Sequence, residues 1–325
     1  MIVTLTAHPA IDRLVALDGP LRRGAVLRTA PSSDQPGGKG LNVARVVQAA
    51  GVPVRAVVPV APDDALLTAL RPTGLAVVVV PVAGSTRVNL TLAEPDGTTT
   101  KLNAPGTSPA PAELDALASA LVDAARGATW VALCGSLPPG VPVDWYAALL
   151  PRLRATGVRV AVDTSGPALD AVLALDGSGP AEHAPDVVKP NGHELVELIG
   201  GDAEAIESDP SLAAAEAQRL RAERGPGEVL LTLGATGAVL ATARGTWFCP
   251  SPPITPRSTV GAGDASLAGL LLARESGADD EGALASAVAH GSAAAALEGS
   301  TPPTPADVDA LVPTTARALG VTALS

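Results

Sequence analysis

The sequence predicts an α/β protein in which a mainly parallel sheet is covered by helices on both faces and a small β lid stands apart. Short β-branched runs alternate along the chain with segments rich in alanine and leucine, which is typical of strand–helix–strand units. At two places, two strand-like segments follow one another with no helix between them. We expect these two pairs to form the lid.

The elements of the main sheet follow one another in a regular order. Predicted strands are the apolar runs at residues 2–7, 54–60, 75–82, 129–134, 158–163, 186–189 and 228–233. Predicted helices follow the glycine-rich segment 37–40 and lie at residues 111–125, 143–155, 191–199, 211–223 and 262–274. Helices on both faces would bury the strands on both sides.

The two helix-free stretches define the predicted lid. The first combines residues 13–19 with residues 25–31, and the second, residues 86–103, carries a Pro-Asp-Gly turn between alternating segments. We expect lid segments at roughly residues 12–34 and 84–105 that close over a substrate and exclude water. An ordinary surface hairpin is the alternative interpretation.

Composition limits the classes of function. Hydrophobic residues form 47% of the chain, which is enough to build a core, and the net charge is −11 with 2% aromatic residues. An acidic chain poor in aromatic residues argues against a nucleic-acid surface. No apolar run reaches the roughly 20 residues of a membrane helix, and the first residues do not resemble a signal peptide. We expect a cytoplasmic protein without nucleic-acid or membrane partners.

Lysine and asparagine are rare in this sequence and occur in clusters. The three lysines and four asparagines all fall within residues 37–42, 86–103 and 189–194. A drift of composition towards arginine would explain why lysine is scarce, but it does not explain the clustering. Since arginine supplies the general surface charge, a remaining lysine indicates a need for a compact ammonium group. These segments are therefore candidates for a site.

The glycine-rich segment from Thr259 to Asp264 directly precedes a helical run. Gly261 and Gly263 allow a tight turn, and the helix start presents unpaired N–H groups and the positive end of its dipole. This predicts a cradle for an anion. Asp264 has two possible roles, helix cap or general base. The phosphate loops GxxxxGK[ST] and GxGxxG are absent from the sequence, so P-loop and dinucleotide-oxidoreductase functions are not favoured.

Taken together, these segments resemble the ribokinase-like sugar kinases of the phosphofructokinase B type. The matching motifs are HPAID (8–12), GGKGLNVAR (37–45), RVNLTL with TKLNAPG (87–106), CGSLPPGVP (134–142), VDTSG (162–166), VKPNGHE (188–194), LTLGATGAVL (231–240) and VGAGDASLAG (260–269). The resemblance implies a ribokinase-like three-layer α/β/α sandwich and a single kinase domain over residues 1–325. It also implies ATP-dependent phosphorylation of a sugar phosphate.

Within this family, the stretch TTTKLNAPG is most similar to the bacterial 1-phosphofructokinases. This implies conversion of fructose 1-phosphate to fructose 1,6-bisphosphate, with tagatose 6-phosphate and fructose 6-phosphate as alternative substrates. A sugar-phosphate sensor that binds without turnover is an alternative of another class. His8, Cys134 and Ala265 replace the Asn, Ser and Ser that are usual in the family, and the first two lie near the expected sugar pocket.

For the transfer step, the resemblance implies that Asp264 takes the proton of the attacking sugar hydroxyl. Backbone N–H groups of Gly261, Ala262 and Gly263 would hold the migrating phosphoryl group. Phosphoryl transfer mainly requires such positioning and electrostatic stabilisation.

For the sugar, the resemblance implies that Asp12 and Asn42 hold hydroxyl groups. Gly37 and Gly38 would let the backbone approach the sugar and act as a lid hinge, and Ser136 would add a hydroxyl donor. A strand-end cap remains the alternative for Asp12, and a turn-forming role remains the alternative for Ser136.

The phosphate of the sugar requires nearby cations in an acidic protein. The candidates are Lys39, Arg87 and Lys101, without a choice among them. Because lids of this fold can clasp one another, we also expect a homodimer formed through the lid.

For the nucleotide, the resemblance implies contacts with Lys189, Thr232, Gly234 and Gly237. A simple β-turn would also explain the two glycines. Asn191 and Glu194 lie three residues apart at a helix start and would organise Mg²⁺ through water, with helix capping as the alternative.

Overall fold

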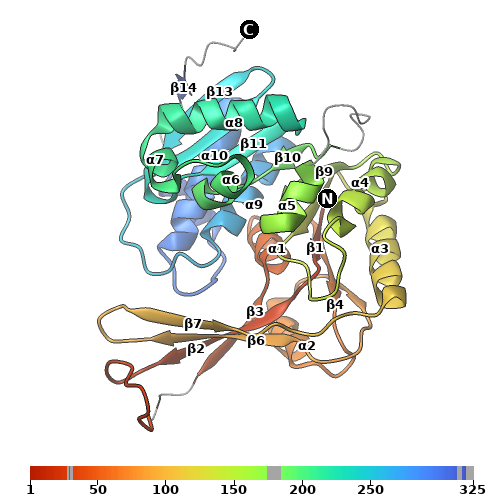
Figure 1. Cartoon of the computed structure of the whole chain (residues 1–325), viewed down its shortest axis with the longest axis vertical. Helices are drawn as coiled ribbons and strands as arrows, with labels where there is room; N and C mark the ends of the chain where they lie inside the picture. Colours follow the sequence, from red (N-terminus) through yellow and green to blue (C-terminus); the bar gives the residue numbers. More distant parts are fainter. Residues whose placement is uncertain (28, 30–31, 174–183, 313–316, 320–325) are drawn as a thin grey trace.

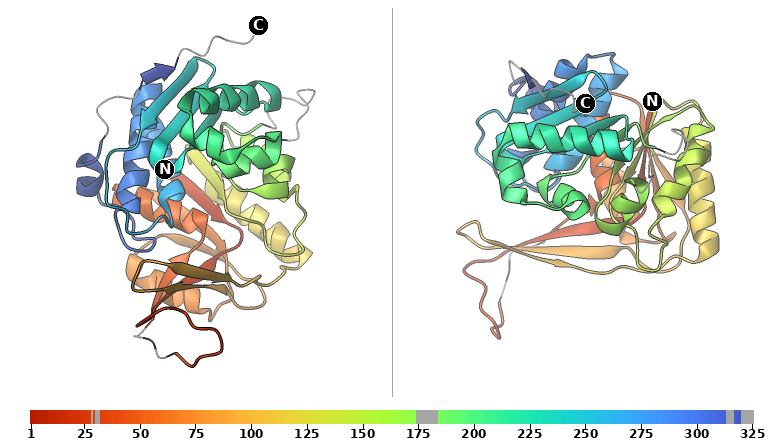
Figure 2. Two further views of the ribbon diagram at one scale, coloured as in Figure 1. Left: turned by 60° about the vertical axis from the view of Figure 1, so that its left-hand side comes forward. Right: turned by 45° about the horizontal axis from the view of Figure 1, so that its top comes forward.

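The computed structural model describes residues 1–27, 29, 32–173, 184–312 and 317–319 (Figure 1). It contains one ten-stranded and one four-stranded sheet. The larger sheet is the middle of three layers with helices on both faces, and the smaller sheet projects from this body (Figures 1 and 2). The predicted α/β class with a separate small β layer is confirmed.

The larger sheet is parallel over most of its width. Its strands are β1 (Ile2–Thr6), β4 (Val54–Pro59), β5 (Val77–Val80), β8 (Trp130–Cys134), β9 (Arg159–Asp163), β10 (Val187–Val188), β11 (Glu228–Thr232), β12 (Gly237–Thr242), β13 (Gly245–Pro250) and β14 (Arg317–Leu319). Their order is β14-β13-β12-β11-β10-β9-β8-β1-β4-β5. Pairs from β5 to β11 are parallel, and those from β11 to β14 are antiparallel. All the parallel strands were predicted from the sequence, whereas β12 to β14 were not.

Helices pack on both faces of this sheet, as predicted. One face is covered by α3 (Pro111–Ala125), α4 (Trp145–Arg154), α5 (Gly166–Leu173), α6 (Gly192–Ile199), α7 (Ala203–Ser208) and α8 (Pro210–Arg224). The other is covered by α1 (Lys39–Ala49), α9 (Ala262–Glu275) and α10 (Asp280–Ala295). Short helices α2 (Ala65–Leu70) and α11 (Pro305–Asp309) and the 3₁₀ turns η1 (Arg71–Thr73) and η3 (Gly234–Thr236) complete the described elements.

Helix α10 was missed by the sequence analysis because it carries no amphipathic pattern. Most of its residues are alanine, glycine or serine, and its buried residues lie all around the helix axis. It packs closely against α9, where Gly269 leaves room for the His290 ring. No helix of the described segments has the length and hydrophobicity of a membrane span.

The four-stranded sheet has the order β3-β2-β6-β7. Its strands are β2 (Ala10–Ala16), β3 (Ser33–Gly37), β6 (Arg87–Ala93) and β7 (Thr99–Asn103). The predicted hairpin within residues 86–103 is present, and it turns at Gly97, whose φ is 92°. The second pairing within the sheet, between β2 and β6, is parallel.

The other predicted lid pair was wrong in its second strand. The partner of β2 is β3, at residues 33–37, and not the segment 25–31. Within that segment, residues 25–27 form no strand and Thr29 makes one isolated bridge to Leu17, while residues 28, 30 and 31 lie outside the described residues. The sequence Ser-Asp-Gln-Pro-Gly of β3 has low strand propensity, so its pairing depends on tertiary contacts and on its edge position, which tolerates Pro36.

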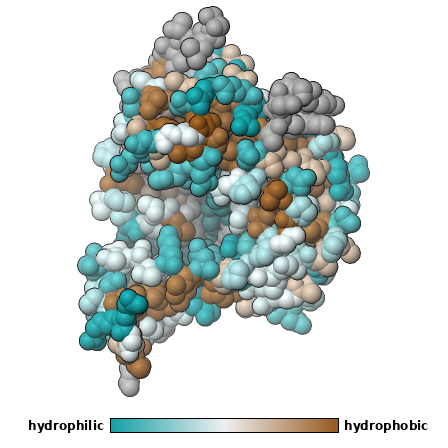
Figure 3. All heavy atoms as spheres, in the orientation of Figure 1, coloured by the Kyte–Doolittle hydropathy of each residue, from teal (hydrophilic) through white to brown (hydrophobic). Residues whose placement is uncertain are grey.

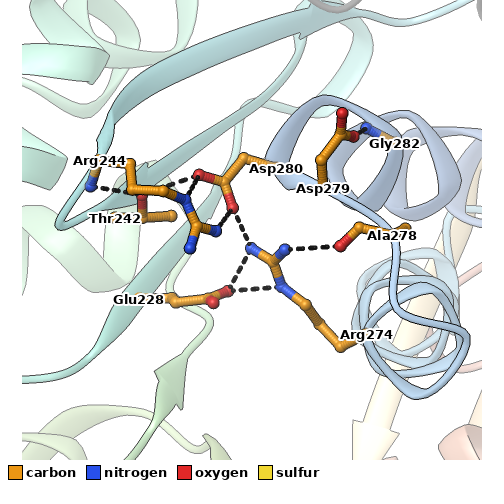
Figure 4. A network of polar contacts seen from close by, with 8 residues as sticks. All are labelled: Glu228, Thr242, Arg244, Arg274, Ala278, Asp279, Asp280 and Gly282. Carbon is orange, nitrogen blue, oxygen red and sulfur yellow. Dashed lines mark hydrogen bonds and ion pairs between the residues drawn. The ribbon is translucent and has the colours of Figure 1, made fainter.

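An ion-pair network holds the C-terminal end of α9 against the sheet and against α10 (Figure 4). The Arg274 guanidinium lies 3.0 Å from Glu228 Oε2 on β11 and 2.7 Å from Asp280 Oδ1 on α10. Asp280 also accepts hydrogen bonds from Arg244 and Thr242, at the turn between β12 and β13. This network fixes the position of α9, whose other end faces the site described below.

Candidate active site

Side chains from several loops meet at the carboxyl ends of the parallel strands. Asp163 is the last residue of β9, Lys189 directly follows β10, and Asp264 lies in the first turn of α9. Figure 3 shows the surface hollowed between the main body and the four-stranded sheet. Ligands of open α/β sheets bind at this kind of edge.

The N-terminus of α9 has the open geometry expected of an anion cradle. Gly261 is the N-cap residue with φ 80°, a left-handed conformation that favours glycine, and no side chain caps the helix. A Cβ on Gly263 would lie 3.4 Å from Lys189 Nζ, so the absent side chain leaves the ammonium group close to the backbone.

Asp264 does not cap its own helix. Its carboxylate accepts a hydrogen bond from Asn42 Nδ2 at 2.7 Å, and the side chain is 6% exposed. Burial and then the charge of Asp163 raise the pKa of Asp264 to about 6, although Lys39, Asn42 and Lys189 oppose this rise. A carboxylate with a raised pKa has the properties required of a general base near neutral pH.

Asp163 joins the two lysines of the site. Lys39 Nζ lies 2.7 Å and Lys189 Nζ 3.4 Å from the same oxygen, Asp163 Oδ1. Burial alone would raise the pKa of this carboxyl group, but the two ammonium groups hold it below its usual value. Conversely, burial alone would lower the pKa of Lys39, whereas the charges of Asp163, Glu194 and Asp264 hold it above its usual value. Lys39 therefore stays charged close to Asp264.

Asp163 was not singled out by the sequence analysis, although it lies in the motif VDTSG. The available signal was its position, because a carboxylate that ends an apolar parallel strand faces the binding edge of the sheet. Its role as a bridge between Lys39 and Lys189 depends on three segments distant in sequence and could not be inferred from spacing.

The structure separates the three cations that were expected to share one phosphate. Lys39 pairs with Asp163 and lies 3.6 Å from Glu194 Oε1, within the cluster around Asp264. Arg87 and Lys101 belong instead to β6 and β7 of the small sheet.

Arg87 and Lys101 accompany Asp12 on the small sheet. Asp12 accepts a hydrogen bond from Asn89 Nδ2 at 2.9 Å. Burial raises its pKa, and the charges of Arg87 and Lys101 oppose this rise. A Cβ on Gly37 would overlap the Asp12 carboxylate, so a side chain at this position would displace that carboxylate.

Gly38 connects the small sheet to α1. Its φ is 115°, and a Cβ there would lie 2.6 Å from Thr6 Cγ2. Four residues later, the buried Asn42 donates to Asp264. The segment from Gly37 to Asn42 thus links the Asp12 side of the site to the Asp264 side.

Asn191 and Glu194 form a reciprocal capping box at the start of α6. Asn191 Oδ1 accepts from the backbone N–H of Glu194 at 2.8 Å, and Glu194 Oε2 accepts from the backbone N–H of Asn191 at 2.9 Å. The capping interpretation is therefore present in the structure. The other carboxylate oxygen, Glu194 Oε1, faces Lys39. Within the described parts of the chain, no three His, Cys, Asp or Glu side chains form a metal cluster.

Gly234 and Gly237, which were expected beside the nucleotide, have different structural surroundings. A Cβ on Gly237 would overlap the Cys249 carbonyl, so the pairing of β12 with β13 requires this glycine. Gly234 has φ 55° and faces open space. Thr232 ends β11 and bridges to Asn191, which places it beside the capping box.

Comparisons with known proteins agree with this geometry. A model of the pfkB family of carbohydrate kinases matches residues 11–307. The chain is 40% identical over 283 residues to a 1-phosphofructokinase of Rhodobacter capsulatus, covering 86% of this chain and 85% of that protein. It is 34% identical over 280 residues to a 1-phosphofructokinase of Escherichia coli K12, covering 85% of each chain.

Solved structures show the same fold. Phosphofructokinase-2 of Escherichia coli, in complex with substrates and products, superposes with a TM-score of 0.85 at 28% identity, covering 96% of this chain and 98% of that chain. Ribokinase of Thermotoga maritima superposes with a TM-score of 0.70 at 18% identity, covering 95% of this chain and 98% of that chain. The expected ribokinase-like sandwich is therefore confirmed.

Proposed function

This chain belongs to the pfkB family of carbohydrate kinases and is an ATP-dependent sugar kinase, and we propose that it phosphorylates fructose 1-phosphate to fructose 1,6-bisphosphate. One observation carries the chemical part of this proposal. The buried Asp264, with its pKa raised to about 6, lies at the glycine-bounded start of α9 beside two lysines that pair with Asp163. The names of the relatives support the choice of acceptor.

In the proposed reaction, Asp264 accepts the proton of the acceptor hydroxyl as the sugar oxygen attacks the γ-phosphorus of ATP. Asn42 occupies Oδ2 of the carboxylate and holds its orientation, which leaves Oδ1 for the hydroxyl. The bond from the γ-phosphorus to the bridging oxygen breaks, and ADP leaves. Most of the acceleration in such a step comes from positioning and from groups that stabilise the developing charge.

The developing negative charge would be stabilised from two sides. Backbone N–H groups of Gly261, Ala262 and Gly263 supply donors at the positive end of the α9 dipole. Lys39 and Lys189 supply two ammonium groups whose positions are fixed by the Asp163 carboxylate. We therefore assign Lys39 to the transferred phosphoryl group rather than to the phosphate of the sugar.

The sugar phosphate would lie across the segment that joins the two sheets. Asp12 would accept hydrogen bonds from sugar hydroxyls, and Gly37 and Gly38 would allow close approach of the backbone. Arg87 and Lys101, whose charges act on Asp12, would hold the phosphate of the substrate.

ATP would extend from Gly263 along Lys189 towards the β11–β12 turn, which contains Thr232 and Gly234. Mg²⁺ fits this arrangement because it keeps most of its water shell and needs few protein ligands. The oxygen atoms that could hold its hydration shell belong to Asn191 and Glu194. Glu194 Oε1, which lies 3.6 Å from Lys39 Nζ, is not used by the capping box. When bound, Mg²⁺ would neutralise charge on the phosphates of ATP.

The four-stranded sheet would act as the lid of this site and as a dimer contact. Its strands expose apolar side chains, Leu14 at 39% and Leu102 at 54%, and Figure 3 shows apolar atoms along this sheet. A related phosphofructokinase-2 of Escherichia coli is described as tetrameric in an inhibited form.

A substrate panel tests the proposed function. ADP formation is measured with fructose 1-phosphate, fructose 6-phosphate and tagatose 6-phosphate at one low concentration, with ATP and Mg²⁺. We expect the highest kcat/KM with fructose 1-phosphate. A higher value for either other sugar would reassign the acceptor, and binding of sugar phosphates without ADP formation would identify a sensor.

A further inference from the structure

His8 lies just beyond the end of β1. Of its two ring nitrogens, Nδ1 makes a polar contact and Nε2 makes no hydrogen bond of standard geometry in the described structure. Its Nδ1 is 3.3 Å from Ser136 Oγ, in the loop after the neighbouring strand β8. Its Nε2 is buried and has no hydrogen-bond partner of standard geometry among the described residues. A buried polar atom without a partner is destabilising, so its retention calls for a ligand or another specific reason.

The ring of His8 is neutral near neutral pH. Burial and then the charge of Arg87 lower the pKa of His8 to about 4, and the nearby Pro105 backbone opposes this only in part. A neutral imidazole has one N–H donor and one acceptor nitrogen. When the Ser136 hydroxyl donates to Nδ1, the hydrogen is on Nε2. This N–H makes no hydrogen bond of standard geometry in the described structure, although the ring interacts with the Pro105 backbone.

Arg87 borders the same space as His8 Nε2. Its terminal nitrogens donate over 3.4 Å to the backbone carbonyls of Ala104 and His8, whereas its Nε has no partner in the described structure. A Cβ on Gly106 would lie 2.5 Å from His8 Nε2 and 3.5 Å from Arg87 Cδ, so a side chain at this position would press against the His8 ring. His8, Arg87 and Gly106 all line one pocket, together with residues such as Thr107.

We propose, on the premise of the sugar kinase function above, that His8 is a specificity-determining residue whose Nε2–H donates a hydrogen bond to a phosphate oxygen of the sugar substrate. Two buried donors without hydrogen bonds of standard geometry, one neutral and one on a guanidinium, belong to residues that line the same pocket. A phosphate oxygen satisfies both donors, because it accepts several hydrogen bonds and carries charge opposite to that of Arg87. A sugar hydroxyl would leave Arg87 without an anionic partner there.

Two substitutions at His8 separate this role from simple packing. The amide nitrogen of His8→Gln reaches about as far as Nε2, whereas that of His8→Asn lies near the position of Nδ1. We expect His8→Asn to raise the KM for fructose 1-phosphate about 10- to 100-fold, as for loss of a hydrogen bond to a charged group, with kcat changed less than about threefold. His8→Gln should recover most of this loss. The exposed His193 of α6 gives the control variant His193→Ala, with an unchanged KM.

The substrate dependence identifies the contacted group. Loss at His8→Asn should be large with fructose 1-phosphate and absent, in kcat/KM, with unphosphorylated fructose. Equal losses with both sugars, or equal losses in His8→Gln and His8→Asn, would overturn the proposal.

A measurement without turnover makes the test independent of the kinase assignment. In ¹⁵N-histidine-labelled protein, we expect His8 to be the Nε2–H tautomer and its Nε2 resonance to shift when inorganic phosphate is added, while His193 does not respond. A shift without ADP formation from any sugar phosphate would refute the kinase function and retain the phosphate contact. ADP formation with no shift from inorganic phosphate or from fructose 1-phosphate would refute the contact and retain the kinase.

Discussion

Helix α9 has a polar cluster at each end, and the two clusters shift the pKa of their carboxyl groups in opposite directions. At the C-terminal end, the carboxylate of Asp280 is surrounded by donors from Arg244, Arg274 and Thr242 (Figure 4). Burial alone would raise the pKa of Asp280, but these donors hold it below its usual value. At the N-terminal end, burial and Asp163 raise the pKa of Asp264 to about 6.

The two clusters also differ in unused hydrogen-bonding capacity. Asn42 Oδ1 and Asp163 Oδ2, both at the N-terminal end, are buried without a partner in the described structure, whereas no such atom belongs to the network around Asp280. Unpaired buried groups lower stability, and paired ones fix geometry. We propose that the C-terminal end of α9 is a scaffold, and that the unpaired groups at the N-terminal end serve to bind a substrate.

The largest effect is expected from Asp264→Asn, which removes the proposed base but keeps the shape of the side chain. We expect kcat to fall about 10²- to 10⁴-fold, the span typical of losing a general base. Initial rates of ADP formation at saturating substrates measure this, with circular dichroism as the control for folding. A fall of less than about threefold would show that both ends of α9 are scaffold.

A smaller loss is expected from Asp163→Asn, which releases both lysines. We expect kcat to fall about 10- to 10³-fold because the ammonium groups are no longer held beside the phosphoryl group.

The wild-type kcat/KM should fall as the pH drops below about 6, where Asp264 becomes protonated. Since Asp163 helps to raise that pKa, the acidic limb of the profile should move to lower pH in the variant. An acidic limb at the same pH in Asp163→Asn and wild type would show that the charge of Asp163 does not affect the pKa of Asp264.

Lys101→Ala removes a cation that belongs to neither cluster. Lys101 is exposed on β7, so the expected rise in KM for fructose 1-phosphate is modest, about three- to tenfold. The KM for ATP should stay constant, because Lys39 and Lys189 are unaffected. Equal rises in both KM values would point to a structural role for Lys101 within the small sheet.

The smallest effect on turnover is expected from Arg274→Gln at the scaffold end of α9. Loss of hydrogen bonds to Glu228 and Asp280 should lower the free energy of unfolding by about 1.5–3 kcal/mol. The kcat should stay within about threefold of wild type, since α9 keeps its packing against α10. Chemical denaturation and steady-state kinetics on the same preparation measure both. A loss of activity larger than the loss of folded protein would contradict the scaffold role.

Sequence patterns predicted those parts of the molecule that depend on local order. The parallel strands and helices α1, α3, α4, α6, α8 and α9 were predicted, because burial on both sheet faces produces apolar runs. The shorter helices α2, α5, α7 and α11 were not predicted. The glycine-rich start of α9 was also predicted, since Gly261 adopts the left-handed conformation that favours glycine. Its role as an anion cradle stays a prediction. β3 and α10 were missed because tertiary contacts, and not propensity, determine them.

The electrostatic organisation of the site could not be predicted from the sequence. Asp264 and Asn42 are 222 residues apart in the chain, and Lys39 and Asp163 are 124 apart. Spacing therefore gave no reason to place Lys39 with Asp163 rather than with Arg87. Likewise, the capping box of Asn191 and Glu194 could be recognised as a pattern, but the position of Glu194 Oε1 beside Lys39 depends on the fold.

The free energy of unfolding at pH 8, compared in Asp264→Asn and Asp280→Asn, tests the contrast between the two ends of α9 most directly. The folded-state pKa of Asp264 lies above its usual value, so its ionisation destabilises the fold as the pH rises through about 4 to 6. Asp264→Asn should therefore gain stability on the order of 3 kcal/mol at pH 8, and no gain below about pH 4. Asp280→Asn should lose about 1.5–3 kcal/mol at pH 8. A loss of stability in both variants at pH 8 would contradict this account.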